Sequence, residues 1–171
     1  LTGSSLSLYV GANLWRLGYP EIAYPILAEE RTRFANHPVY WQLMFQITTD
    51  LSLSGPMLQA ASSLYRLAPD QPKHKHNFAS LLLSQRQQLD RALTLSYEVF
   101  LERPHYAAAR INYAQALTLT DRLDEAAEHL AQIDTRNLNL TEQQGYLFAK
   151  MLIHKYKKEP TLAQQTAQKI L

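Results

Sequence analysis

The chain has 171 residues, of which 46% are hydrophobic, and a formal net charge of only +2 from 17 Lys and Arg against 15 Asp and Glu. The apolar content excludes a disordered chain, and the near balance of charge excludes a molecule whose whole surface attracts nucleic acid or membrane. Cysteine is absent, so disulfides and thiolate metal sites are excluded and the redox compartment stays open. No apolar run approaches the roughly 20 residues that a membrane-spanning helix needs.

The spacing of apolar residues predicts ten helices separated by short polar breaks. The first five are expected at 4–17, 20–35, 40–53, 56–67 and 73–85. The others are expected at 89–102, 105–119, 122–133, 141–156 and 161–171. Pro25 falls inside the second helix, where it should remove a hydrogen bond to the Glu21 carbonyl and bend the helix or delay its start.

Two helix starts carry side chains that can bind unpaired backbone amides. Thr120 and Asp121 are expected to cap the eighth helix, because their side-chain oxygens can accept from its first amides. Thr141 is expected to form a capping box with Gln144 at the start of the ninth helix.

A short pattern recurs at intervals of about 35 residues. The ten helices form five antiparallel pairs along the chain. In the first helix of a pair a large apolar residue precedes a small one, as in Val10-Gly11, Ile47-Thr48, Phe78-Ala79 and Tyr113-Ala114. Second helices have an alanine near their start, at Ala23, Ala60, Ala92 and Ala126. The small residue lets two helices approach closely and the large one fills the space beside it, so the pattern describes packing rather than chemistry.

These copies resemble the tetratricopeptide repeat (TPR) family, in which a proline precedes the next repeat, as Pro72 and Pro104 do here. The resemblance covers residues 5–135 well and is weaker in the last helix pair. It implies an all-α fold, namely a right-handed superhelix of antiparallel helix pairs of the TPR-like α-solenoid type. We expect one repeat domain over 1–171, as part of a longer protein, with repeats at 4–37, 38–72, 73–104, 105–137 and 138–171.

In TPR proteins the first helices line a concave groove, and matching the copies indicates which side chains would face it here. The candidate set contains no carboxylate and comprises Tyr9, Ala12, Arg16, Gln42, Phe45, Gln46, Thr49, Lys73, His76, Asn77, Ser80, Ala108, Ile111, Asn112, Gln115, Gln143, Tyr146 and Lys150. Amides, hydroxyls, aromatic rings and a few cations suit an extended peptide backbone or an acidic segment of a partner. The resemblance therefore implies a non-enzymatic scaffold that binds a protein or peptide partner.

The candidate groove residues also allow other interpretations. The amides of Asn77 and Asn112 could instead tie neighbouring first helices together. The family's carboxylate clamp is not expected, because Leu8, Phe45, His76 and Ile111 stand where the clamp would need a cation.

Two other functions belong to different classes. Single-stranded RNA binding is the first, because helical repeats can read single strands and the last helix pair is basic, although the candidate groove has few cations. Self-assembly is the second, through a C-terminal helix on which Ala163, Ala167 and Ile170 would be covered by a next repeat or a second copy, giving a homo-oligomer.

No metal or cofactor is expected. His74 and His76 are two positions apart on a helix, so they point away from each other, and the flanking lysines repel a cation. The segment 73–76 is therefore expected to be a solvated helix start. The sequence has no Gly-rich phosphate loop and no hydrolase or zinc-protease motif. Trp15 and Trp41 are expected to be packing residues.

Overall fold

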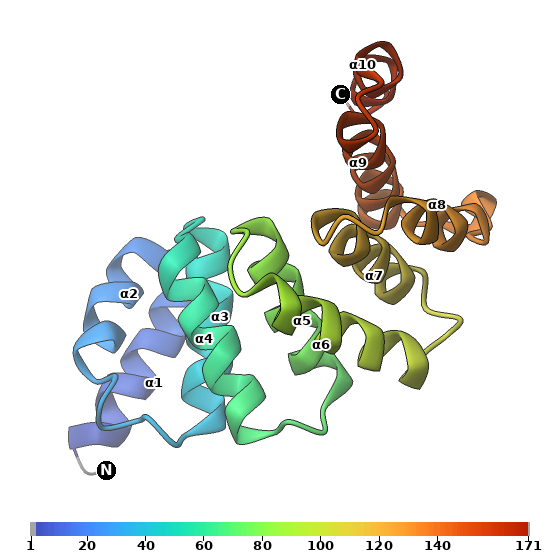
Figure 1. Cartoon of the computed structure of the whole chain (residues 1–171). Coiled ribbons are helices and arrows are strands. Elements are labelled where there is room, and N and C mark those ends of the chain that lie inside the picture. Colours follow the sequence, from blue (N-terminus) through green and yellow to red (C-terminus); the bar gives the residue numbers. More distant parts are fainter. Residues whose placement is uncertain (1–2, 171) are drawn as a thin grey trace. The chain divides into compact units, whose positions relative to one another are not determined.

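A computed structural model describes residues 3–170, and every regular element in this part of the chain is a helix (Figure 1). All ten predicted helices are present within it, which confirms the all-α prediction. Their bounds are α1 (Gly3–Arg16), α2 (Pro20–Glu29), α3 (Pro38–Asp50), α4 (Ser54–Leu67), α5 (Pro72–Ser84), α6 (Leu89–Glu102), α7 (Ala107–Leu119), α8 (Leu123–Ala131), α9 (Leu140–Tyr156) and α10 (Pro160–Ala167). One 3-10 helix, η1 (Thr135–Asn137), lies in the connector before α9.

The chain divides into two compact units, Leu1–His74 and Lys75–Leu171. In the first unit α1 packs against α2 and α3 against α4, and in the second α7 packs against α8 and α9 against α10. The division falls near the start of α5, close to the predicted boundary between the second and third repeats.

The small residues of the repeat pattern lie where two helices meet. Gly11 is buried, and the residues at the matching positions of the next three repeats are 0% exposed, namely Thr48, Ala79 and Ala114. The second-helix alanines are also 0% exposed, at Ala23, Ala60, Ala92 and Ala126. A Cβ atom added to Gly11 would lie only 2.6, 2.7 and 2.8 Å from the Cγ, Cδ1 and Cδ2 atoms of Leu27. The pattern thus marks buried positions of the fold, and at Gly11 it marks a close approach of α1 to α2.

Aromatic side chains build the core of the first unit. Trp41 is 4% exposed and donates from Nε1 to the Ala35 carbonyl at 2.9 Å, which fits its predicted packing role. The half-buried Trp15 donates from Nε1 to Asp50 Oδ2 at 2.7 Å and thereby joins α1 to the end of α3. Tyr40 is 0% exposed and donates from Oη to the Leu27 carbonyl at 2.9 Å, and burial raises the pKa of Tyr40 to about 12.

The second helix differs from its prediction in length. It begins at Pro20, so Pro25 does not delay its start, and it ends at Glu29 rather than near Ala35. Turns follow as far as residue 36, where the Phe34 amide donates to the Glu30 carbonyl at 3.0 Å. The spacing of apolar residues did not distinguish this turn-rich segment from the helix that precedes it.

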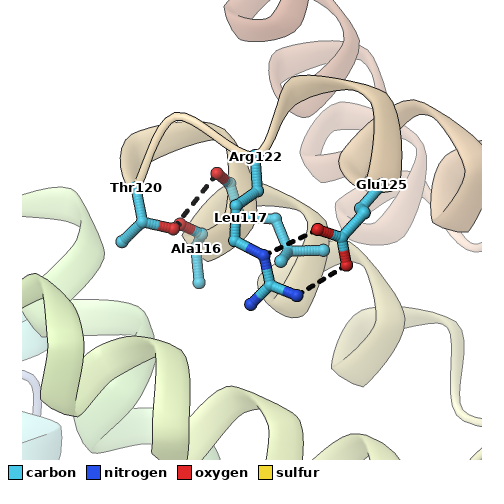
Figure 2. A network of polar contacts seen from close by, with 5 residues as sticks. All are labelled: Ala116, Leu117, Thr120, Arg122 and Glu125. Carbon is cyan, nitrogen blue, oxygen red and sulfur yellow. Dashed lines mark hydrogen bonds and ion pairs between the residues drawn. The ribbon is translucent and has the colours of Figure 1, made fainter.

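The predicted cap of the eighth helix is wrong. Thr120 Oγ1 donates to the carbonyls of Ala116 and Leu117 at 2.9 and 3.2 Å, so it binds the end of α7 (Figure 2). The N-cap of α8 is Arg122, which makes no side-chain cap hydrogen bond. Its guanidinium instead pairs with Glu125 through Nε and Nη2 at 2.7 and 2.6 Å (Figure 2).

The capping box of α9 exists, but it stands two positions earlier than predicted. Asn139 Oδ1 accepts from the Glu142 amide at 3.0 Å, and Glu142 Oε2 accepts from the Asn139 amide at 3.1 Å. Thr141 and Gln144 therefore do not form the box.

The predicted solvated helix start at 73–76 is also wrong in part. Lys73 is exposed, but Lys75 is only 8% exposed and its ammonium lies 2.9 Å from Glu98 Oε2 and 2.6 Å from Glu102 Oε1 on α6. Burial acts to lower the pKa of Lys75, but the hydrogen bonds to Glu102 and Glu98 outweigh it and raise that pKa overall. This ion pair fastens α5 to α6.

Candidate partner-binding surface

The predicted residues of the first unit are mostly at the surface. Tyr9 is 64% exposed and Arg16, Gln42, Gln46 and Thr49 are exposed, whereas Phe45 is half-buried against the core. The Thr49 hydroxyl donates to the Phe45 carbonyl at 2.7 Å within α3. Lys73, at the start of α5, is exposed as well.

In the second unit the structure brings His76 of α5 and Asn112 of α7 together. Asn112 is 8% exposed, and its Nδ2 lies 3.3 Å from His76 Nδ1. Burial, and secondarily the charge of Arg103, lower the pKa of His76 below its usual value, so the neutral ring can accept from the Asn112 amide. The Tyr106 ring lies 5.7 Å from the His76 ring, centroid to centroid.

The Asn112 side chain therefore links two neighbouring first helices, as the structural alternative for this amide proposed. Its carbonyl oxygen is still without a hydrogen-bond partner among residues 3–170. Asn77 and Ser80, further along α5, are half-buried, and their side chains have no hydrogen-bond partner in the described part of the chain.

The junction of α7 and α9 holds the remaining candidates. Gln115 is half-buried and donates from Nε2 to the Gly145 carbonyl at 3.4 Å, a long bond that holds the amide weakly. Tyr146 is half-buried, and Gln143 and Lys150 are exposed. Ala108 is half-buried, but Ile111 is 3% exposed and belongs to the core between α7 and α9, so its side chain does not reach solvent.

The sequence did not predict a pocket of about 370 Å³ in the second unit. The pocket is lined by the connector before α7, by the connector after α8 and by Arg110, whose guanidinium lies 4.9 Å from the centre of the Phe100 ring. Arg110 Nη1 donates to Gln132 Oε1 and Nη2 to the Pro104 carbonyl. The carboxylates in the lining are engaged, Asp134 by Arg136 and Glu142 by the capping box. In the sequence, only the unusual length of the connector before α9 could have indicated this pocket.

The described residues offer neither a metal site nor a membrane-spanning helix. No cluster of three or more His, Asp or Glu side chains in residues 3–170 could hold a metal ion. Over the same residues, none of the helices combines the length and the hydropathy needed to cross a bilayer.

Comparison with known proteins supports the repeat pattern seen in the sequence. The sequence model of the tetratricopeptide repeat matches residues 82–145, which run from α5 through α8 into α9. The chain has a helical repeat fold of the TPR type. No curated protein sequence matches it significantly.

Solved TPR structures share this fold at low sequence identity. MamA of Desulfovibrio magneticus RS-1, from residue 41 to its end, is 19% identical with a TM-score of 0.68, over 99% of this chain and 94% of that one. A tetratricopeptide repeat protein from Parabacteroides merdae is 12% identical with a TM-score of 0.70, over 98% of this chain and 64% of that one. YrrB, described as a TPR protein with an unusual peptide-binding site, is 12% identical with a TM-score of 0.65, over 96% and 82%.

Proposed function

We propose that the second unit of this TPR protein is a non-enzymatic scaffold that binds an extended segment of a partner protein along its first helices, α5, α7 and α9. The observation that carries the proposal is a set of side chains on these helices whose hydrogen-bonding capacity the fold leaves unused. The amide of Asn77, the hydroxyl of Ser80 and the carbonyl oxygen of Asn112 have no partner among the described residues.

Such groups match what a peptide backbone requires. An extended backbone offers alternating N–H donors and C=O acceptors, and an amide side chain can satisfy both at once. The neutral His76 and Asn112 pair fixes the position of the central amide. Fixing a binding group in advance lowers the entropy that is lost on binding. YrrB, which has a similar fold, is a TPR protein with an unusual peptide-binding site, and this similarity supports the proposal.

Lys150 gives the surface its cationic character in this unit, so an acidic side chain of the partner would be favoured at α9. Neither Asp nor Glu occurs among the candidate residues to repel it. Single-stranded RNA suits the surface less well, because a strand-binding groove needs several cations along the backbone path.

The test is selection from a displayed library of random peptides, followed by calorimetric titration of the selected peptide. The Asn77→Ala/Lys150→Ala variant should bind the peptide at least roughly tenfold more weakly, because a lost hydrogen bond and a lost charge pair together remove about 1.5 kcal/mol or more. The matched control is Gln164→Ala/Lys169→Ala, at exposed positions of α10 and of the turn after it. It removes the same kinds of group and should bind like the wild type.

Equal binding by both variants would place the peptide elsewhere and refute the proposed site. Failure to select any peptide, together with tight binding of a labelled single-stranded RNA, would instead favour the RNA function.

A further inference from the structure

Two amide side chains of α7, Asn112 and Gln115, turn their nitrogen atoms toward neighbouring helices of the second unit. Asn112 Nδ2 lies 3.3 Å from His76 Nδ1 of α5, and Gln115 Nε2 donates to the Gly145 carbonyl of α9 at 3.4 Å. Each amide thus uses its nitrogen within the fold and keeps its oxygen for other partners. Residues three positions apart share one face of a helix, with Cβ atoms about 5–6 Å apart.

Both amide oxygens are reachable by solvent. Neither Asn112 Oδ1 nor Gln115 Oε1 has a hydrogen-bond partner among residues 3–170. The buried side-chain atoms of that part of the chain that have no partner are Ser96 Oγ and His129 Nδ1, so the two amide oxygens are not buried. Although Asn112 is only 8% exposed, its small exposed surface therefore includes Oδ1. One face of α7 thus presents two hydrogen-bond acceptors.

His76 determines which end of the Asn112 amide faces outward. An amide nitrogen only donates, so His76 Nδ1 accepts from it and the proton of the neutral ring lies on Nε2. Turning the amide over would set Oδ1 against the lone pair of Nδ1, two acceptors facing each other. Burial, and secondarily the charge of Arg103, hold the pKa of His76 below its usual value, which keeps the ring neutral at pH 7.

We propose that α7 recognises the N–H edge of an extended partner segment, with Asn112 Oδ1 and Gln115 Oε1 accepting from two backbone N–H groups that are two residues apart. His76 is the positioning residue that keeps the Asn112 oxygen outward. This inference rests on the proposed function and specifies the partner chemistry at α7.

The spacing of the two acceptors fits an extended backbone. The chain rises about 3.3 Å per residue and every second residue points its N–H to the same edge, so N–H groups on one edge recur about every 6.6 Å. This interval is close to the separation of Asn112 and Gln115 along α7. A cation of the partner is the less suitable donor, because no Asp or Glu occurs among the candidate residues to pair with it. Proline lacks the N–H and should be rejected at both positions.

The first arm of the test examines the free chain and needs no peptide. A long-range ¹H–¹⁵N spectrum of the imidazole nitrogens at pH 7.5 distinguishes the two neutral tautomers, and loss of a signal in His76→Phe assigns the ring. We expect His76 to carry its proton on Nε2. A proton on Nδ1 would overturn the inference, because the Asn112 oxygen would then face the ring and the nitrogen would face outward.

The second arm replaces each backbone amide of a selected peptide by an ester, one at a time, which removes a single N–H. Two esters separated by two residues should each weaken binding about three- to tenfold, the effect of one lost hydrogen bond. Double-mutant cycles assign them, since one loss should disappear in Asn112→Ala and the other in Gln115→Ala. The ester of the intervening residue, whose N–H points to the other edge, should couple to neither variant.

His76→Phe tests the positioning role. Phenylalanine keeps an aromatic ring beside Tyr106, whose ring lies 5.7 Å from that of His76, but it removes the acceptor that holds the Asn112 amide. The ester loss assigned to Asn112 should therefore shrink in this variant, while the loss assigned to Gln115 should persist. A purely structural role would lower both losses or neither.

Two results would overturn the inference while leaving the proposed function intact, because that function is tested through Asn77 and Lys150. One is a peptide that requires Asn77 and Lys150 but has no ester position coupled to Asn112 or Gln115. The other is coupling of Asn112 or Gln115 to a lysine or arginine side chain of the peptide instead of to a backbone N–H.

Discussion

Replacement of Gly11 by alanine should destabilise the first unit, although alanine is the better helix former. A Cβ atom at this position would come within 2.6–2.8 Å of three carbons of Leu27. Real Cβ atoms do not approach carbon so closely, and Leu27 is 0% exposed, so its whole side-chain end would have to move. Overpacking of this kind costs about 1–3 kcal/mol, against a gain of about 1 kcal/mol in helix propensity.

Gly145 in α9 provides the matched control. A Cβ atom there would lie 3.5 Å from Ile111 Cγ2, an ordinary van der Waals contact, so Gly145→Ala should stabilise the protein by about 0.5–1 kcal/mol. After subtraction of this gain, Gly11→Ala should be destabilising by up to about 2 kcal/mol. The two substitutions, which are chemically identical, should thus differ by the overpacking cost of about 1–3 kcal/mol.

Urea unfolding followed by circular dichroism measures both values. A double-mutant cycle with Leu27→Ala locates the cause, because Gly11→Ala should cost less once the opposing side chain has been shortened. Equal stabilisation by Gly11→Ala and Gly145→Ala would refute the close contact between α1 and α2.

Three other substitutions test the second unit. Lys75→Met should lower the free energy of unfolding by about 1–2 kcal/mol, because it leaves two partly solvated carboxylates without their cation. Lys73→Met at an exposed site should change that free energy by less than about 0.5 kcal/mol, and thermal unfolding measures both. Burial first, and then the charge of Arg110, hold the pKa of His129 below its usual value, and its Nδ1 has no partner among residues 3–170. The unfolded chain therefore protonates this imidazole more readily than the folded chain does, so stability should fall as pH drops below about 6.5. In urea titrations from pH 7.5 to 5, the stability of the His129→Gln variant should fall less steeply. Asn139→Ala should lower the free energy of unfolding by about 1 kcal/mol through loss of the α9 cap, and Thr141→Ala should lower it by less than about 0.5 kcal/mol. If melting temperatures showed the reverse order, the cap would stand at the position predicted from sequence.

The helix contacts could be predicted from the sequence because each depends on one residue type at a fixed spacing. An alanine such as Ala92 or Ala126 near the start of a second helix has one physical use, which is to let another helix approach, and both are 0% exposed. A family pattern built on packing therefore transfers well even at low sequence identity.

Helix caps were less predictable, because more than one register satisfies the same rule. Thr141 with Gln144 and Asn139 with Glu142 both fit a capping box, and the turn before α9 decides in favour of the second pair. The burial of Lys75 could not be predicted at all. It depends on Glu98 and Glu102 reaching it from α6, a contact that no local pattern encodes.

The most direct measurement of the proposed function is a ¹H–¹⁵N spectrum of the side-chain amides, recorded while a selected peptide is added. Peptide binding along the first helices of the second unit predicts shifts for Asn77, Asn112 and Gln115, with little change for Gln164 and Gln165 on α10. Shifts confined to α10, or to residues around the pocket at Arg110, would contradict binding along the first helices.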